Sequence, residues 1–513
     1  NNMLFLIAHQ NWNGPSAMGY RRLFIMRAFT CICKKNIGMI IMKINNLLGD
    51  EKMGLIEELQ QILAPERVSQ NPTVLEQHSK DESYHTPHLP EAVVFPESAQ
   101  EVSDIIKLAN KHRVPVIPFG MGSSLEGHVI PRGRAITIDF TRMNKIVEIR
   151  EKDFLVRVQP GVTRKQLEKE LKKYGLFFPV DPGADASIGG MAATNASGTT
   201  TVKYGAMRDN VRDLEVVLAD GQIIHTGNLA AKSSSGYHLT GLFVGSEGTL
   251  GCFTEITLKV YGIPEQIMAA RAVFPNVDEA VEAVVDIQQA GIPIARVELV
   301  DEPSIRQVNK YSQTNYKEAP TLFLEFHGNK DGLKQDVALT KAIAEDHHCQ
   351  EIVFETDQAL RHQLWDARHN LAYAFLHAHP GKRQMVTDVC LPITELAGAI
   401  HFAREIVTNS GLPAGIAGHV GDGNFHIIMI VDPNSADDLA RAEKVNEQIV
   451  QYALERKGTC TGEHGVGIGK LKYQAKEHGG AYQIMQTIKQ ALDPMGIMNP
   501  YKKVENETVT HGS

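Results

Sequence analysis

Three loops rich in glycine and small hydroxyl residues constrain the fold of this chain more than any other feature. They read PFGMGSS at 118–124, DPGADASIGGMAATNASG at 181–198 and GSEGTLG at 245–251. Glycine allows backbone N–H groups to approach a ligand closely, and several such groups together bind an anion. One loop of this kind is usually only a tight turn. Three of them in one part of the chain favour a site for a phosphate-bearing ligand.

Several common classes of protein are excluded by what the chain lacks. None of the loops is the G-x-G-x-x-G of a nicotinamide site or the G-x-x-x-x-G-K-S/T of a P-loop. The formal charge of −8, without a long basic run, argues against a nucleic-acid partner. The six cysteines form no C-x-x-C pair, so thiolate-held zinc and iron–sulfur clusters are unsupported. Scattered cysteines fit a reducing compartment.

The chain from about residue 90 to residue 262 alternates between helical and strand patterns. Ser98 and Glu101 form a capping box before a helix that we expect to end near Arg113. Thr163 opens a second capped helix, which Gly175 ends. The predicted strands are VPVIPF (114–119), ITIDF (136–140), KIVEI (145–149), LVRVQ (155–159), LEVVLA (214–219), QIIHTG (222–227) and GCFTEITLKVY (251–261).

The pattern changes after Pro264. A strand at 268–274, a helix at 277–291 and a strand at 295–301 are followed by the same order within 321–356. Two β-α-β units in succession are typical of a ferredoxin-like domain. The tail from 470 to 503 is predicted to be mainly helical.

The first 49 residues contain no Asp or Glu but carry six Arg and Lys residues. An organelle transit peptide has such a composition, but it is also rich in serine, and only Ser16 is present here. Residues 23–33 are too short to span a bilayer. We favour a leader that is not essential, with the native protein starting near Met53, where an amphipathic helix begins.

The glycine-rich loops and a series of later motifs together resemble flavoproteins of the vanillyl-alcohol-oxidase type. The later motifs are LWDARHNLAYAF (364–375), TDVCLPITEL (387–396), GHVGDGNFH (418–426), CTGEHGVGIGK (460–470) and LDPMGIMNP (492–500). From residue 89 to about 505 the chain resembles the D-2-hydroxy-acid dehydrogenases of this superfamily. It is most similar to the D-lactate dehydrogenase (cytochrome) group and next to the FAD subunit of glycolate oxidase.

The resemblance implies an α+β fold with a two-subdomain FAD-binding domain of the vanillyl-alcohol-oxidase (PCMH) type and a ferredoxin-like cap. The domains that we expect are a leader (1–52), the FAD-binding domain (53–262), a cap with the substrate and metal sites (263–470), and a helical tail that returns to the FAD-binding domain (471–513).

The resemblance also implies which residues hold FAD. They are Pro118, Gly120, Gly122, Ser123, Ser124, Pro182, Ser187, Gly190, Asn195, Ser197, Gly198, Glu247, Gly248, Ile256 and Asn499. Some relatives attach FAD covalently through a histidine in the first glycine-rich loop. Here Ser123 and Ser124 occupy that loop, and His128 lies beyond it. We therefore expect FAD to be bound non-covalently.

Two histidines in HVGDGNFH (419–426) and the glutamate of GEHGVG (462–467) are candidate metal ligands. Because the intervening glycines disfavour a helix, a turn must bring His419 and His426 together. Their spacing alone leaves a metal site and two ordinary loop histidines open. The resemblance implies that His419, His426 and Glu463 hold a divalent metal, zinc or manganese.

His464 and Arg368 are the candidates for the chemistry itself. Oxidation of a 2-hydroxy acid requires removal of the hydroxyl proton, and histidine titrates in the range that suits this role. The substrate carboxylate requires a cation, and arginine binds carboxylates with two donors. The resemblance implies that His464 is the base and that Arg368 binds the carboxylate. A structural loop imidazole and a solvated helix charge are the alternatives.

Two further positions bear on the choice of substrate. Some D-2-hydroxyglutarate enzymes of this superfamily carry a lysine where this chain has Val386, and an asparagine where it has Ile428. Without these partners for a second carboxylate, the sequence favours a monocarboxylate such as D-lactate. The alternatives are a glycolate oxidase FAD subunit, a non-catalytic flavin or metal subunit of a redox complex, and a metallohydrolase. The metallohydrolase would leave the three glycine-rich loops unexplained.

The expected partners are a small 2-hydroxy acid and an electron acceptor, which is a cytochrome, a quinone or a partner subunit. The sequence leaves peripheral membrane association and a homodimer open. We expect the protein to be cytoplasmic, at the membrane periphery if it docks there, or mitochondrial if the leader is a transit peptide.

Overall fold

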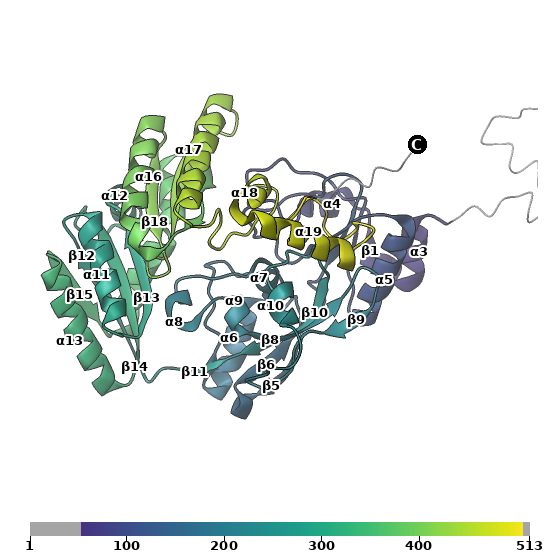
Figure 1. The fold of residues 1–513 in the computed structure, drawn as a ribbon, viewed down its shortest axis with the longest axis horizontal. Helices are drawn as coiled ribbons and strands as arrows, with labels where there is room; N and C mark the ends of the chain where they lie inside the picture. The colour runs from purple at the N-terminus through teal and green to yellow at the C-terminus, as the bar shows by residue number, and fades with distance from the viewer. Residues whose placement is uncertain (1–52, 506–513) are drawn as a thin grey trace, which may run out of the picture. The chain divides into compact units, whose positions relative to one another are not determined.

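The computed structural model describes residues 53–505. The predicted leader (1–52) and the last part of the predicted tail (506–513) lie outside the described residues. The described chain forms three larger sheets, one two-stranded sheet and the helices that cover them (Figure 1). No helix in the described part has both the length and the apolar character needed to cross a bilayer.

The first sheet is mainly parallel. Its strands, in sheet order, are β1 (Val68–Ser69), β2 (Ala92–Val94), β4 (Ile136–Asp139) and β3 (Val116–Phe119). Only β1 runs antiparallel to its neighbour. The helix predicted after Ser98 is α5 (Ala99–His112): the Ser98 side chain accepts from the N–H of Glu101, and Arg113 ends the helix in the left-handed conformation.

The second sheet is antiparallel. Its strands, in sheet order, are β5 (Ile146–Arg150), β6 (Leu155–Val158), β10 (Cys252–Lys259), β8 (Val211–Val217) and β9 (Ile223–His225). A separate antiparallel pair is formed by β7 (Leu176–Phe177) and β11 (Tyr261–Gly262). The remaining helices before residue 262 are α3 (Leu55–Ile62), α4 (Pro72–Gln77), α6 (Arg164–Leu171), α7 (Ile188–Thr194), α8 (Thr201–Tyr204), α9 (Met207–Asn210) and α10 (Leu239–Phe243).

The third sheet contains the predicted ferredoxin-like unit. Its main path, in sheet order, is β15 (Glu351–Glu355), β12 (Gln266–Val273), β14 (Thr321–Gly328), β13 (Ile294–Val300), β18 (Ala414–Gly418), β19 (Asn424–Val431) and β16 (Arg383–Val386). The short strand β17 (Val389–Cys390) also pairs with β19. The first four strands have the order 4-1-3-2 of a ferredoxin-like sheet, as the two β-α-β units predict. Residues 263–265 connect β11 to β12, and we propose the domain boundary there.

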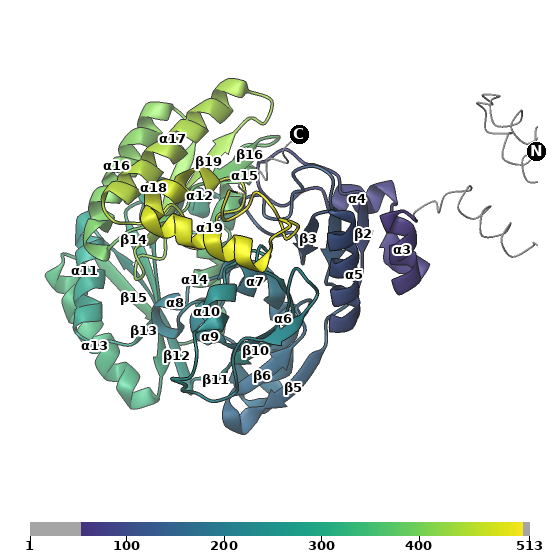
Figure 2. The ribbon, with the colours of Figure 1, turned by 45° about the vertical axis from the view of Figure 1, so that its right-hand side comes forward.

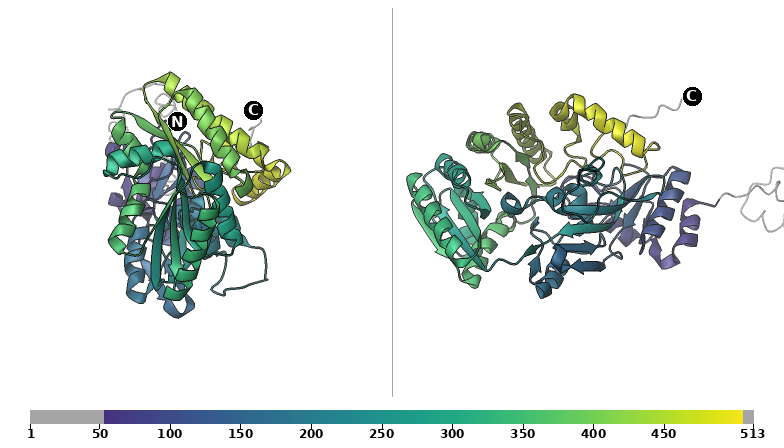
Figure 3. Two further views of the ribbon diagram at one scale, coloured as in Figure 1. Left: turned by 90° about the vertical axis from the view of Figure 1, so that its left-hand side faces the viewer. Right: turned by 60° about the horizontal axis from the view of Figure 1, so that its bottom comes forward.

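Helices cover both faces of the third sheet (Figure 3). Four of them pack on one core: α11 (Val277–Gln289), α13 (Lys330–Asp346), α16 (Leu396–Ser410) and α17 (Ala436–Glu455). Three pack on the other: α12 (Glu302–Ser312), α14 (Gln358–His369) and α15 (Leu371–Ala378).

The C-terminal segment returns to the first two sheets after α18 (Gln474–His478) and α19 (Gly480–Leu492) (Figure 2). The N–H of Asn499 donates to the carbonyl of Val116 at 3.0 Å. The buried Lys489 ammonium donates to Asp493 and to the carbonyls of Thr249 and Met498 at 2.6–2.7 Å. The end of the described chain is therefore fastened to the third glycine-rich loop and to β3.

Candidate active site

The three glycine-rich loops meet around one cavity, whose empty volume is about 1030 Å³ including space open to solvent. Residues that line it come from all three loops and from the C-terminal segment. Those that were predicted to hold the cofactor are Pro118, Gly120, Gly122, Ser123, Ser124, Pro182, Ser187, Gly190, Ser197, Glu247, Gly248 and Asn499. Glu463 and His464 also line the cavity, so the candidate catalytic loop opens onto the same space.

The first two loops touch because residue 120 has no side chain. A Cβ at Gly120 would lie 2.2 Å from Ser187 Oγ. Ser187 is in turn fixed, since its hydroxyl caps α7 and accepts from the N–H of Gly190. Any larger residue at position 120 would push the loops apart.

Asn195, Gly198 and Ile256 lie outside this lining. The Asn195 side chain accepts from the N–H of Arg208. Gly198 is packed against the backbone of Asp181, where a Cβ would lie 1.8 Å from the carbonyl oxygen. Ile256 is fully buried in the apolar core of the second sheet. The structure thus gives these three residues local structural contacts.

Glu247 joins the third glycine-rich loop to the segment that follows His464. Its carboxylate accepts from the N–H groups of Val466 and Gly467 at 2.7 and 2.9 Å. Burial would raise the pKa of Glu247, but Lys503, His128 and the N–H of Val466 hold it well below its usual range. An ionised Glu247 therefore fixes the GEHGVG loop against the cavity wall.

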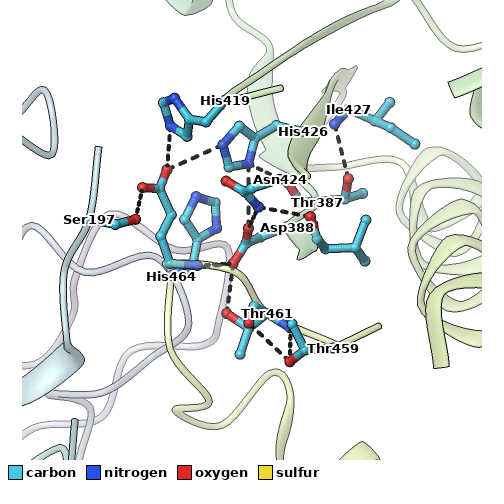
Figure 4. A network of polar contacts seen from close by, with 12 residues as sticks. Ser197, Thr387, Asp388, His419, Asn424, His426, Ile427, Thr459, Thr461 and His464 are labelled. Atoms are coloured by element: carbon cyan, nitrogen blue, oxygen red, sulfur yellow. Dashed lines mark hydrogen bonds and ion pairs between the residues drawn. The ribbon is translucent and has the colours of Figure 1, made fainter. Parts of the chain in front are cut away.

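The predicted metal ligands lie together (Figure 4). His419 begins the turn between β18 and β19, and His426 lies near the start of β19. This hairpin brings the two ring centroids within 5.6 Å of each other. Their Nε2 atoms lie 3.1 and 3.2 Å from Glu463 Oε1. One ligand atom from each residue lies within 4.8 Å of the other two. Two imidazoles and a carboxylate at this separation fit a zinc or manganese ion.

The charges of this cluster are strongly coupled. Burial would lower the pKa of His419, but Glu298 and Glu463 raise it well above the usual value. Burial would raise the pKa of Glu463, but His419 and His426 lower it well below the usual value. The second loop of the cavity contributes to the same cluster, because Ser197 Oγ donates to Glu463 Oε2 at 2.8 Å.

Asp388 organises the loop that carries Glu463 and His464. Its Oδ2 accepts from both of their backbone N–H groups at 2.9 Å and from Thr461 Oγ1 at 2.6 Å. Asp388 could also form a metal site with His426 and His464. Its oxygens are already used as hydrogen-bond acceptors, so the grouping of His419, His426 and Glu463 fits an ion better.

His464 stacks on His426 and is almost fully buried. The two ring centroids are 5.1 Å apart with an interplanar angle of 8°. His464 Nδ1 has no hydrogen-bond partner among the described residues, and Glu126 Oε1 is 4.0 Å away. Burial lowers the pKa of His464 to about 4. The imidazole is therefore neutral at neutral pH, which is the form that a base requires before proton transfer.

Arg368 lies on α14 and is paired with a residue that the sequence did not suggest. Its Nη2 and Nε donate to Glu298 Oε2 at 2.8 and 3.1 Å. Glu298 lies on β13, and its Oε1 is 2.5 Å from His419 Nδ1. The structure therefore links the predicted carboxylate-binding arginine to the predicted metal cluster through one carboxylate.

Two family models match successive parts of the chain. Residues 90–227 match an FAD binding domain, and residues 263–503 match the C-terminal domain of FAD linked oxidases. A protein of Danio rerio named probable D-lactate dehydrogenase, mitochondrial, is 45% identical over 455 residues, which cover 88% of this chain and 92% of the relative. Glycolate oxidase subunit GlcD of Bacillus subtilis is 33% identical over 451 residues, covering 87% and 96%.

The chain belongs to the FAD-linked D-2-hydroxy-acid dehydrogenase family. It is an FAD-dependent oxidoreductase. The solved structure of p-cresol methylhydroxylase with substrate bound is similar over 88% of this chain and 96% of that chain, with a TM-score of 0.74 and 16% identity. The predicted α+β fold of the PCMH type is thus confirmed.

The cavity of this dehydrogenase fits FAD. Its walls are largely backbone and small side chains, which suits a ligand with a pyrophosphate. Four buried polar atoms on lining residues have no hydrogen-bond partner in the described part of the chain: His128 Nδ1 and Nε2, His464 Nδ1 and Asn499 Oδ1. A polar ligand would satisfy such groups.

Sequence reasoning missed the residues of this dehydrogenase that hold the site residues in place. Glu298 was the one carboxylate within the otherwise apolar strand pattern around VELV, which was the available signal. Asp388 stood inside the quoted motif TDVCLP and was not singled out. His128 was placed outside the cofactor motif, yet it lines the cavity.

Proposed function

We propose that the protein oxidises a small D-2-hydroxy acid, D-lactate above all, to the 2-oxo acid. One observation carries this proposal: hydrogen bonds run from Arg368 through Glu298 and His419 to Glu463, and Glu463 lines the cavity of the glycine-rich loops together with its neighbour His464. The name of the Danio rerio relative supports the choice of D-lactate.

Arg368 binds the substrate carboxylate in this proposal. Two of its five N–H donors are held by Glu298, and the donors on Nη1 remain for the substrate. Because Glu298 fixes the guanidinium, little side-chain entropy is lost when the acid binds.

His464 accepts the proton of the substrate hydroxyl while the hydrogen at C2 leaves as hydride. FAD, when bound, supplies the two-electron acceptor for that hydride. His464 can act because it is neutral, buried and next to the cavity. Asp388 holds the His464 backbone in place, so the imidazole is positioned before the substrate arrives.

His419, His426 and Glu463 are proposed to hold zinc or manganese. Such an ion, when bound, would stabilise negative charge on a substrate oxygen. The Nδ1 atoms of the two histidines face Glu298 Oε1 and the carbonyl of Thr387, which leaves both Nε2 atoms toward Glu463.

A monocarboxylate is favoured over a dicarboxylate. Val386 and Ile428, which replace polar residues of some dicarboxylate enzymes, are direct partners across β16 and β19. Both belong to the apolar cluster beneath α14 and α15. A second carboxylate placed there would have to be buried without a cation.

The remaining proposals concern the whole protein. FAD is non-covalent, and the electron acceptor is a cytochrome, a quinone or a partner subunit. The name of the Danio rerio relative favours a mitochondrial location over the cytoplasmic one. Peripheral membrane association and a homodimer are compatible with these proposals. Residues 1–52 are dispensable for FAD binding, and a chain expressed from Met53 that loses its flavin would refute this point.

Anaerobic bleaching of the flavin absorbance tests the proposed reaction. D-lactate, L-lactate, glycolate and D-2-hydroxyglutarate are added separately to the purified flavoprotein. We expect D-lactate to bleach the flavin fastest and L-lactate not to bleach it. Preference for glycolate would favour the glycolate oxidase subunit, and no bleaching by any acid would favour a non-catalytic flavin subunit.

A further inference from the structure

Glu298 is a buried carboxylate with two different partners, one on each oxygen. Oε1 lies 2.5 Å from His419 Nδ1, and Oε2 accepts from Arg368 Nη2 and Nε at 2.8 and 3.1 Å. The residue is 0% exposed. Water cannot replace either partner without opening the site.

The position of Glu298 in the fold keeps it rigid. It lies inside β13, where its backbone pairs with Phe323 of β14. Arg368 comes from α14 and His419 from the turn after β18. One strand residue therefore bridges a helix and a hairpin that are far apart in the sequence.

The two nitrogens of His419 have separate tasks. Nδ1 faces Glu298, and Nε2 faces Glu463 Oε1 at 3.1 Å. When Nδ1 carries the hydrogen and donates it to Glu298, the lone pair of Nε2 points toward the proposed ion. A carboxylate that accepts from the other nitrogen makes a metal-binding imidazole more basic and fixes its orientation.

We propose that Glu298 is a positioning residue that couples occupation of the metal site to binding of the substrate carboxylate. This inference rests on the proposed function of Arg368 and of the three metal ligands. When Arg368 also binds the substrate carboxylate, its hydrogen bonds to Glu298 become weaker. Glu298 then becomes a stronger acceptor for His419, which binds the ion more tightly. By linkage, the ion strengthens binding of the acid by the same factor.

The chain contains a matched control for this arrangement. Glu325 on β14 is also buried and also lies between an arginine and a histidine: Arg296 Nε is 3.3 Å and His327 Nε2 is 2.7 Å from its Oε1. Neither partner belongs to the proposed metal cluster. Glu325→Gln therefore reports the general cost of neutralising a buried carboxylate of this kind.

The test measures the zinc affinity of the FAD-loaded protein by competition with a chromophoric chelator. No 2-hydroxy acid is present in this measurement. We expect Glu298→Gln to raise the zinc dissociation constant about 10- to 100-fold, because the loss of a hydrogen-bond partner of a metal-binding histidine typically costs this much affinity. Glu325→Gln should leave it unchanged. If the two variants weaken zinc equally, or if Glu298→Gln has no effect, the coupling is refuted.

The zinc affinity of Arg368→Met distinguishes the proposed coupling from a merely structural role of Glu298. It removes the charge that competes for Glu298, so zinc should bind several-fold more tightly in this variant. In the double variant Glu298→Gln/Arg368→Met, the effect of Arg368→Met should vanish, since Glu298 transmits it. An effect of Arg368→Met that is the same with and without Glu298 would refute the coupling.

Two additional variants keep the test decisive. If Glu298→Gln does not retain FAD, Glu298→Asp replaces it in the test. The shorter side chain keeps the charge but cannot reach both partners, so the affinity for zinc should again fall. His419→Ala distinguishes failure of the proposed metal site from failure of the coupling alone. If it does not lower zinc binding, the proposed metal site fails and the coupling with it. If it abolishes zinc binding while both Glu298 variants bind zinc normally, only the coupling fails.

Discussion

The two sides of the cavity differ in the chemical groups that line them. The side formed by the glycine-rich loops presents backbone and small side chains, with Gly120 touching Ser187. On the cap side Glu463 and His464 line the cavity, and Glu463 contacts the buried His419, which in turn contacts the buried Glu298. Backbone N–H groups hold an anion without changing protonation, whereas buried side chains can move protons and bind cations.

This difference assigns separate tasks to the two sides. The first side is suited to holding FAD and the cap side to the chemistry of the substrate. Substitutions on the cap side should therefore slow the reaction or remove the metal while FAD stays bound. Substitutions in the glycine-rich loops should remove FAD itself.

The largest effect on rate is expected for His464→Ala. Loss of a general base typically slows the chemical step about 10²- to 10⁴-fold. Stopped-flow reduction of the flavin by D-lactate measures it, with the flavin spectrum of the variant as the control for bound FAD. Reduction at a rate near that of the wild type would remove His464 as the base.

Arg368→Ala should have a smaller effect that appears in binding as well as in rate. A hydrogen bond between charged groups contributes roughly 1.5–3 kcal/mol, or about 10- to 100-fold in affinity. The dependence of the reduction rate on D-lactate concentration separates the two effects. If only the limiting rate changes and half-saturation does not, Arg368 does not bind the ground-state carboxylate.

Val386→Lys should shift substrate choice by about tenfold toward D-2-hydroxyglutarate, because one charged hydrogen bond to the second carboxylate is worth about 1.4 kcal/mol or more. The ratio of reduction rates for the two acids at low concentration is the readout. Gln384→Lys, two residues earlier on β16, is the control. A shift of equal size in both variants would show that added charge alone is responsible.

The smallest effect is expected on stability, at Glu126. Burial raises the pKa of Glu126 to about 7, against the lowering effect of Lys470 and His128, while Asp388 and Asp81 raise it further. A carboxyl whose pKa is raised on folding stabilises fully below its unfolded pKa of 4.5, and this contribution is lost as pH rises through about 7.

Glu126→Gln should therefore gain on the order of 1–3 kcal/mol of stability relative to the wild type between pH 5 and pH 8. Thermal unfolding of both proteins at the two pH values measures this. A difference between the proteins that does not change with pH would contradict the buried neutral carboxyl.

Elements that depend on local sequence rules were predicted better than contacts that form only on folding. The helix after Ser98 and the two β-α-β units follow local rules of capping and periodicity, and they form as predicted. The residues His419, His426 and Glu463 were named from motifs, and the structure brings them together. The partners that hold them were not named, because they come from other strands and become neighbours only on folding.

Ile256 and Glu298 illustrate this limit from opposite directions. Ile256 was named from the resemblance, but the alternation of β10 turns its side chain into the apolar core. Glu298 has apolar neighbours in sequence, and its burial is made tolerable by two partners from elsewhere in the fold, His419 and Arg368. Neither contact could be read from spacing along the chain.

One paired measurement tests the separation of the two sides most directly: the zinc or manganese content and the FAD content of the same purified samples. We expect His419→Ala to lose the metal and keep one FAD per chain. Gly120→Val, whose side chain would collide with Ser187 Oγ, should lose most of its FAD. If His419→Ala loses FAD together with the metal, or keeps its full metal content, the division of tasks between the two sides is contradicted.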